Sequence, residues 1–191
     1  MYDETQLRII DATMTLIIEK GYSGATSKSI AKLAGVNEST IFRRFNGKKE
    51  IVLAAMELAK WNPGLSESDF IYHGKLTDDL IAFAEVYMSK VTPQMVKVSI
   101  GLRSAELEGA AMPGIMKVPL IFKKVLMNYF TEMTAKGKMR ECDIESVSLQ
   151  FIAMNFGFVF LEASFGDKLI GVSKKDYIRK SVELFVNGIN A

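Results

Sequence analysis

Residues 26–50 constrain the fold of this chain more than any other stretch, because they predict two short helices joined by a tight turn. Thr26 can cap the first helix, since its side-chain oxygen can accept a hydrogen bond from a backbone N–H one turn in. Gly35 stands where the chain must leave that helix, in a left-handed conformation that only glycine adopts cheaply. Asn37 can cap the second helix, which we expect over about residues 38–45. This arrangement predicts a helix-turn-helix.

The second short helix has an apolar back and a polar front. Ile41 and Phe45 are four residues apart and share the apolar face. The other face carries Ser39, Thr40, Arg43 and Arg44. Small residues let a helix backbone approach DNA, and arginine can bond bidentately to guanine or clamp a phosphate. We therefore expect this helix to enter the major groove.

A longer pattern extends through and beyond these two helices. It runs Thr26-x-x-x-Ile30-Ala31-x-x-Ala34-Gly35-Val36-Asn37, then Thr40-Ile41-Phe42-x-x-Phe45-x-x-Lys48-x-x-Ile51. With the preceding helix, from Arg8 to Tyr22, it resembles the DNA-binding domain of the TetR family of transcriptional repressors over about residues 5–55. The chain departs from the family at three positions. Phe42 stands where the family usually has a tyrosine whose hydroxyl contacts phosphate, Arg44 replaces a common histidine, and Gly47 replaces a common Ser or Thr cap.

The polar front and the resemblance together imply a set of DNA-contacting residues. These are Thr26, Ser27, Lys28, Asn37, Ser39, Thr40, Phe42, Arg43, Arg44 and Lys48. We expect Ser39, Thr40 and the two arginines to face the bases. Thr26, Lys28 and Lys48 are expected to grip phosphates, Lys48 from the first turn of the fourth helix, where a phosphate would offset its unfavourable position.

Charge supports DNA binding modestly. Residues 1–50 hold 8 basic and 6 acidic side chains, whereas the remainder holds 16 of each, so the formal excess of +2 lies in the first fifty residues. Most charge runs are solvated faces. Two-helix segments with a glycine turn also occur in helical proteins that bind no nucleic acid. The alternative is therefore a helical homodimer that acts only as a protein-interaction module.

Helical periodicity continues to the end of the chain and predicts an all-α protein with about nine helices. The further helices are expected over about 48–61, from 77, then over 93–108, 118–136, 143–165 and 174–188, with a loop over 109–114. We expect an N-terminal three-helix DNA-binding domain over 1–47 and a helical effector-binding and dimerisation domain over 48–191.

The last two helices carry apolar stripes that predict a dimer interface. The expected interface residues are Phe151, Met154, Phe158, Leu161, Phe165, Ile178, Val182 and Phe185. The 143–165 helix is apolar on two faces, and one face needs a further cover. A helix buried centrally in a monomer is the alternative. In the TetR family the last two helices form the dimer interface, and a palindromic operator suits a two-fold dimer.

The resemblance also implies an effector pocket in the second domain. Its expected lining is Phe83, Tyr87, Met88, Arg103, Met116, Phe122, Met127 and Phe130. Methionine and aromatic side chains can line a cavity that accepts varied apolar shapes. We expect a hydrophobic small-molecule effector that lowers operator affinity. Plain close packing is the alternative for each of these residues.

Several function classes find little support in the sequence. A single histidine, His73, argues against a zinc site or a histidine-based catalytic centre, and no phosphate-binding glycine loop occurs, so we expect no enzyme, cofactor or metal. A single cysteine, Cys142, fits a reducing cytoplasm. Asp3 and Glu4 stand where a signal peptide would be basic and apolar. No uninterrupted apolar run is expected to span a bilayer, so no membrane partner is expected.

Overall fold

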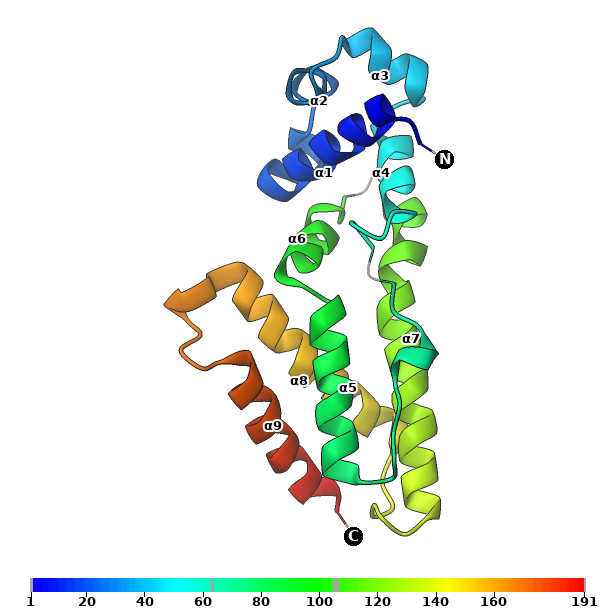
Figure 1. Cartoon of the computed structure of the whole chain (residues 1–191), viewed down its shortest axis with the longest axis vertical. Helices are drawn as coiled ribbons and strands as arrows, with labels where there is room; N and C mark the ends of the chain where they lie inside the picture. The colour runs from blue at the N-terminus through cyan, green and yellow to red at the C-terminus, as the bar shows by residue number, and fades with distance from the viewer. Residues whose placement is uncertain (1, 63, 105–106, 191) are drawn as a thin grey trace. The chain divides into compact units, whose positions relative to one another are not determined.

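The structure is a computed structural model that describes residues 2–62, 64–104 and 107–190 (Figure 1). Across these ranges the helices are α1 (Glu4–Gly24), α2 (Ser27–Ala34), α3 (Glu38–Arg44), α4 (Lys48–Met56), η1 (Glu67–Asp69), α5 (Leu76–Lys90), α6 (Pro93–Gly101), α7 (Glu108–Ala135), α8 (Ile144–Phe165), η2 (Gly166–Lys168) and α9 (Lys174–Ile189). The labels η1 and η2 mark short 3-10 helices. The predicted all-α class with about nine α-helices is confirmed for the described residues.

The chain divides into two compact units, and each is described by itself. Unit 1 comprises residues 1–63 and 94–116, and unit 2 comprises residues 64–93 and 117–191. Unit 1 therefore holds α1 to α4, nearly all of α6 and the first part of α7. Unit 2 holds α5, the rest of α7, α8 and α9. The functional boundary between residues 47 and 48 stays a prediction.

Three predicted element boundaries are wrong. α4 ends at Met56 and α6 ends at Gly101, so both are shorter than expected. α7 begins at Glu108 and includes the segment 109–114, which was predicted to be a loop. Pro113 and Pro119 each remove one backbone donor from this helix. The helix continues because tertiary packing outweighs local propensity, since the side chains of Ala111, Val118 and Phe122 along it are buried.

Both ends of α1 are defined by local sequence. The Asp3 side chain accepts from the Gln6 backbone N–H at 2.9 Å, and the Asp3 N–H donates to Gln6 Oε1 at 3.0 Å, so the two residues form a capping box. Gly21, at φ 71°, interrupts the regular helix near its end. Between these points Ile10, Met14 and Ile17 are fully buried in the core of unit 1.

α6 packs against α1 at a glycine. A Cβ atom on Gly101 would lie 2.8 Å from the Ile17 carbonyl oxygen and 2.9 Å from Ile17 Cγ2. Such distances are too short for real atoms, so the absence of a side chain allows this approach. Val98 and Leu102, on either side of Gly101, are buried in the same core as α1.

Unit 2 is built around packed aromatic rings on α5, α7 and α8. Tyr87 stacks on Phe122 with ring centroids 4.5 Å apart, and Phe83 meets Tyr129 edge-on at 5.1 Å. The segment 64–75, which we call the strap, adds Phe70, whose ring lies 5.2 Å from that of Phe122. Offset and edge-to-face pairs at these separations add stability beyond their area burial.

A buried carboxylate fixes the end of the strap to α5. Asp79 is 3% exposed and accepts hydrogen bonds from the backbone N–H groups of His73 and Lys75, each at 2.8 Å. It also accepts from the Tyr129 hydroxyl at 2.9 Å. Burial, followed by this bond to Asp79, raises the pKa of Tyr129 far above its ordinary value. The three donors satisfy the buried carboxyl group.

α8 is a long and strongly apolar helix. With η2 it forms a segment of 25 residues, Ile144–Lys168, that is long and apolar enough to cross a membrane by length and composition alone. The segment meets this criterion although polar residues such as Asn155 interrupt its apolar run. Core helices of soluble proteins pass it too, and one face of α8 is buried against the rest of unit 2.

Candidate nucleic-acid interface

The turn between α2 and α3 has the predicted geometry. The Thr26 side chain accepts from the Ser29 N–H at 3.2 Å and caps α2. Gly35 adopts φ 67° and ψ 40°, the left-handed conformation that ends α2. Asn37 occupies the N-cap position of α3 with an extended backbone, but its side chain makes no capping hydrogen bond. Its amide therefore stays available to other partners at the exposed start of α3.

α3 buries one side and exposes the other. Ile41 is 1% exposed and Phe45 is 7% exposed, so the predicted apolar back is confirmed. Ser39, Phe42 and Arg43 are exposed, and Thr40 is half-buried. Figure 1 shows α2 and α3 as separate short helices joined by this turn. The exposed side of α3 is the surface that a DNA groove would meet, and its base contacts stay a prediction.

Arg44 has a partner within unit 1 that the sequence did not suggest. Its Nη1 lies 2.8 Å from Asp3 Oδ2, and both side chains are close to two-fifths exposed. The same Asp3 caps α1 through its other oxygen. The pair therefore links the end of α3 to the start of α1. An ion pair this exposed contributes little stability, but it orients the arginine.

Lys48 is also engaged inside unit 1. Its Nζ donates to the Tyr22 carbonyl oxygen at 2.6 Å and lies 3.9 Å from the centroid of the Tyr22 ring. Lys48 thus joins the first turn of α4 to the end of α1. Gly47, the N-cap of α4, has φ 134° and offers no side-chain cap. The remaining predicted phosphate contact, Lys28, is exposed on α2, and Ser27 is half-buried there.

The residues predicted to line an effector pocket do not all come together. Phe83, Tyr87, Met88, Phe122 and Phe130 are buried in unit 2, where Met127 is half-buried. Arg103 and Met116 belong to unit 1 and are exposed. The buried rings pack on one another, as the alternative reading of close packing expected. Burial raises the pKa of Tyr87 far above its ordinary value, so its hydroxyl stays protonated.

One buried polar group in unit 2 stands out. Asn155 of α8 is 1% exposed, and its Nδ2 donates to the Phe151 carbonyl oxygen at 2.7 Å. Its Oδ1 is buried without a hydrogen-bond partner among the residues that the structure describes. A buried acceptor left in this way costs free energy, and such groups often mark a site for a ligand or a bound water.

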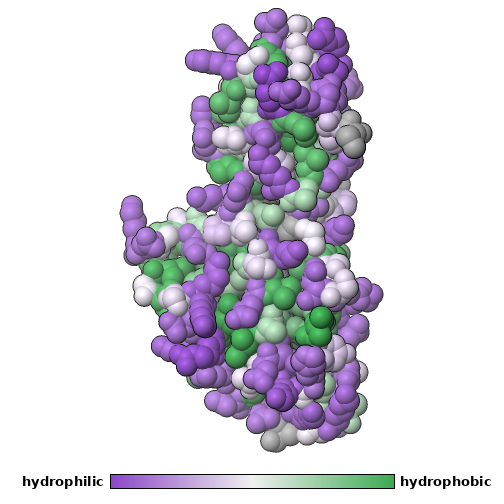
Figure 2. All heavy atoms as spheres, viewed as in Figure 1, coloured by the Kyte–Doolittle hydropathy of each residue, from purple (hydrophilic) through white to green (hydrophobic). Residues whose placement is uncertain are grey.

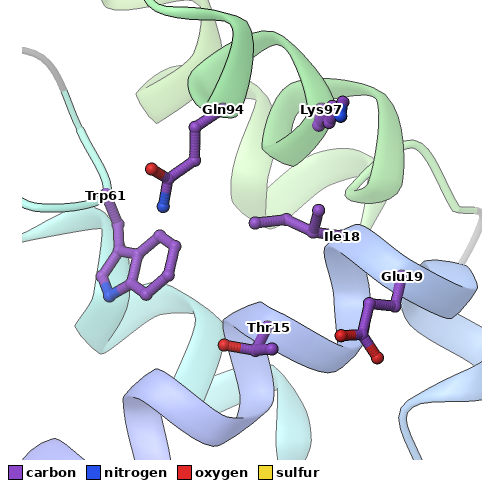
Figure 3. Close-up of a pocket in the computed structure, with 6 residues that line it drawn as sticks. All are labelled: Thr15, Ile18, Glu19, Trp61, Gln94 and Lys97. Atoms are coloured by element: carbon purple, nitrogen blue, oxygen red, sulfur yellow. The ribbon is translucent and has the colours of Figure 1, made fainter. Parts of the chain in front are cut away.

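Unit 1 contains a hollow that no predicted residue lines. It has a volume of about 340 Å³ and is lined by Thr15, Ile18, Glu19, Trp61, Gln94 and Lys97 (Figure 3). Figure 3 shows the Trp61 ring and the Ile18 side chain pointing into it from opposite sides. The indole is held in place because its N–H donates to Asp11 Oδ1 at 3.1 Å.

The predicted dimer residues fall into two groups. Phe151, Phe158, Ile178 and Val182 are buried within unit 2, so these four side chains are already covered by their own chain. Tyr177, for example, stacks on Phe158 with ring centroids 4.3 Å apart. The other four lie nearer the surface: Leu161 is 38% exposed, Phe165 is 52% exposed, and Met154 and Phe185 are half-buried.

A different stripe of α8 faces outward. It consists of Leu149, Ala153, Phe156 and Phe160, which recur at helical steps and are exposed, and on α9 Leu184 is 74% exposed. We call these five residues the outer stripe. Figure 2 shows hydrophobic surface over part of unit 2. Exposed apolar patches of this kind mark interaction sites.

A helix-turn-helix that buries an apolar back and exposes small polar residues with an arginine is typical of a DNA-binding transcriptional regulator. Comparison with known proteins supports this class. Residues 9–55 match the family of bacterial regulatory proteins called the tetR family. The HTH-type transcriptional regulator YvkB of Bacillus subtilis strain 168 is 29% identical over 189 residues, which are 98% of each chain. The chain therefore carries a DNA-binding segment of the TetR type over residues 9–55 and resembles a transcriptional regulator along its whole length.

Solved structures of other transcriptional regulators have the same fold. NalD of Pseudomonas aeruginosa, the secondary repressor of the MexAB-OprM multidrug efflux pump, aligns over 98% of this chain and 96% of its own, with a TM-score of 0.73 and 15% identity. FadR of Bacillus subtilis, in complex with stearoyl-CoA, aligns over 96% and 99% with a TM-score of 0.70 and 23% identity. At these identities the likeness establishes the fold.

Proposed function

We propose that the chain is a ligand-responsive repressor that binds a palindromic operator as a homodimer. The observation that carries the proposal is the exposed front of α3, where Ser39 and Arg43 stand clear of a buried back. NalD is named a repressor, and FadR holds an acyl-CoA. A module without DNA binding is not favoured, because an arginine-bearing front would be a poor surface for an apolar protein partner.

Within this proposal the DNA contacts divide by role. Arg43 and Ser39 read base edges in the major groove, where arginine matches the O6 and N7 acceptors of guanine. Thr26, Lys28 and Lys48 contact phosphates and set the register of the helix. Arg44 acts mainly by positioning, because its guanidinium is held by Asp3 at the start of α1.

Two copies of the chain pair through the outer stripe. One short helix reads only one half-site, so a palindrome requires a two-fold partner with half-sites about 34–36 Å apart. The outer stripe gives each chain an exposed apolar face that a second copy can cover by self-complementary packing. Leu161 and Phe165 are also exposed on α8, but they follow Phe160 by one and five residues and so lie on a different side of the helix from the stripe.

The effector enters unit 2 by displacing the strap. Phe70 and Tyr72 of the strap cover the aromatic rings, and hydrogen bonds at the surface hold the strap, including Tyr72 Oη to Glu132 at 2.6 Å. A ligand with an apolar body would replace Phe70 against Phe122. A hydrogen-bond donor on that ligand would satisfy Asn155 Oδ1, which has no partner among the described residues.

The effector would control DNA binding because ligand binding and operator binding are thermodynamically linked. The ligand lowers operator affinity only as far as it binds the DNA-free arrangement more tightly than the DNA-bound one. The effector class is therefore a hydrophobic molecule with at least one donor. The chemistry admits acyl-CoA esters, which carry amide N–H groups, aromatic phenols, and fatty acids in their protonated form, because an ionised carboxylate has no donor.

The test of the DNA proposal is selection of bound duplexes from a random pool at about 50 mM salt, where phosphate contacts are strong. We expect enrichment of a palindrome whose half-sites lie one helical turn or a multiple apart. If no sequence is enriched over the starting pool, the proposal fails.

The dimer and effector proposals have separate tests. Sedimentation at micromolar concentration should give a dimer for the wild type and a monomer for Phe156→Glu. The matched control is Ile71→Glu, which also introduces a glutamate in place of an exposed apolar residue, here a strap residue that is 71% exposed. This variant should stay dimeric.

For the effector, stearate, stearoyl-CoA and a phenol panel are screened by thermal shift, and each hit is titrated against the protein–DNA complex. A hit that stabilises the protein but leaves DNA affinity unchanged would contradict ligand control.

A further inference from the structure

Phe42 is an apolar ring on the face of α3 that is otherwise polar. Its residue is 56% exposed, whereas Ile41 before it is 1% exposed. Along the helix it stands between Ser39, one turn earlier, and Arg43, the next residue, and both of these are exposed. Among the described residues, its ring pairs with no other aromatic ring. Phe42 therefore lies within the surface proposed to enter the major groove.

The major groove offers an apolar ring one favourable partner. Thymine presents a C5-methyl group there beside its O4 acceptor, whereas guanine, adenine and cytosine present hydrogen-bonding groups and no methyl group. Phenylalanine has no donor or acceptor, so placing it over the cytosine amine or guanine oxygen would bury a polar group unpaired. A methyl group against the ring gains apolar burial instead.

We propose that Phe42 selects thymine in each half-site through its C5-methyl group, at a base pair within one or two steps of the guanine read by Arg43. The spacing follows because adjacent helix residues rise only about 1.5 Å along the axis. This inference rests on the proposed function, since it requires α3 to lie in the major groove. Phe42, whose side chain cannot hydrogen-bond to phosphate, would thus contact a base instead.

The test removes only the methyl group. In the duplex enriched by the wild type, each thymine is replaced singly by deoxyuracil, which keeps base pairing and loses the C5-methyl. We expect one thymine per half-site at which wild-type binding weakens by about three- to five-fold, the factor for one buried methyl-sized group. The Phe42→Ala variant should bind the thymine and uracil duplexes equally at that position. Phe42→Leu, which keeps an apolar side chain, should retain part of the difference.

A matched control comes from α2. Leu33 is 54% exposed, close to the exposure of Phe42, and Leu33→Ala removes a similar apolar surface from the same unit. Its uracil profile should equal that of the wild type. Circular dichroism of all three variants checks that the fold is kept, as the exposure of both side chains leads us to expect.

The experiment distinguishes failure of the Phe42 proposal from failure of the proposed function. If the wild type enriches a duplex but uracil has no effect at any thymine, or if Phe42→Ala weakens all duplexes equally and keeps the uracil effect, the Phe42 proposal is overturned and the proposed function stands. If the wild type enriches no duplex, both are overturned.

Discussion

The two units of this protein are organised by different forces. Unit 1 is defined by short-range signals, including the capping box of α1, the Thr26 cap and the left-handed Gly35, and its proposed DNA-binding surface is exposed. Unit 2 is defined by long-range contacts among aromatic rings from α5, α7, α8 and the strap. Local signals fix where helices begin and end. Only tertiary contacts fix what a buried face covers.

The largest expected effect concerns the polar anchor of unit 2. Asp79→Ala leaves the Tyr129 hydroxyl and two backbone N–H groups without their acceptor, so it should lower the free energy of unfolding by about 2–4 kcal/mol. Asp78→Ala is the matched control, since Asp78 is exposed and lies 3.8 Å from Lys75. Its effect should stay within about 0.5 kcal/mol in denaturant unfolding. Equal losses in the two variants would refute the anchoring role.

The next effect concerns helix packing in unit 1. Gly101→Ala places a methyl group against the Ile17 backbone and should destabilise by about 1–3 kcal/mol, with a matching loss of DNA affinity if α1 shifts. Gly109→Ala makes the same change in the first turn of α7, where an added Cβ meets nothing within 4 Å. It should be neutral or stabilising by up to about 1 kcal/mol. Thermal unfolding of both variants measures the two changes in stability. If Gly101→Ala leaves the unfolding temperature unchanged, the close packing of α1 and α6 is contradicted.

A third prediction compares two buried polar groups of unit 2. Asp79 has three donors, whereas Asn155 Oδ1 has none among the described residues. Asn155→Leu should therefore leave stability unchanged or raise it by about 1 kcal/mol, in contrast to Asp79→Ala. It should also weaken binding of any effector that donates a hydrogen bond. A large loss of stability in Asn155→Leu would mean that the amide has a structural role.

The smallest effect is a dependence on acid pH in unit 2. A hydrogen bond from Ser146 lowers the pKa of Asp143 below its ordinary 3.8, and one from Ser173 lowers the pKa of Asp176 in the same way. A lowered folded-state pKa contributes stability above the ordinary value, and that stability is lost as the pH falls through the folded value. Unfolding free energy should therefore decline below about pH 4, and less steeply in the double variant Asp143→Asn plus Asp176→Asn. An unchanged slope would contradict this assignment.

The sequence could predict what local chemistry decides. The capping box at Asp3, the caps and turn of the helix-turn-helix, and the Asp143 start of α8 all depend on side chains within one turn of the backbone they serve. The buried back of α3 followed from a four-residue spacing. The resemblance to the TetR family followed from the same stretch, and residues 9–55 match that family's model.

The sequence could not predict what distant contacts decide. Nothing local pairs Arg44 with Asp3 or Lys48 with Tyr22, because each pair joins separate helices. α8 is apolar nearly all round, so periodicity could not choose between Phe151, which is buried, and Phe156, which is exposed. α7 continues through Pro113 and Pro119, which local propensity would place near a helix end, because its buried side chains pack against the rest of the molecule.

The central claim is that the exposed front of α3 reads operator DNA, and one titration tests it most directly. Binding of the enriched duplex and of a scrambled duplex is measured for wild type, Arg43→Ala and Arg140→Ala across a salt series. Arg140 is exposed in unit 2, so this control makes the same change in net charge. We predict that Arg43→Ala loses about 1–3 kcal/mol for the enriched duplex and little for the scrambled one, while Arg140→Ala matches the wild type. Equal binding of the enriched duplex by Arg43→Ala and wild type would contradict the claim.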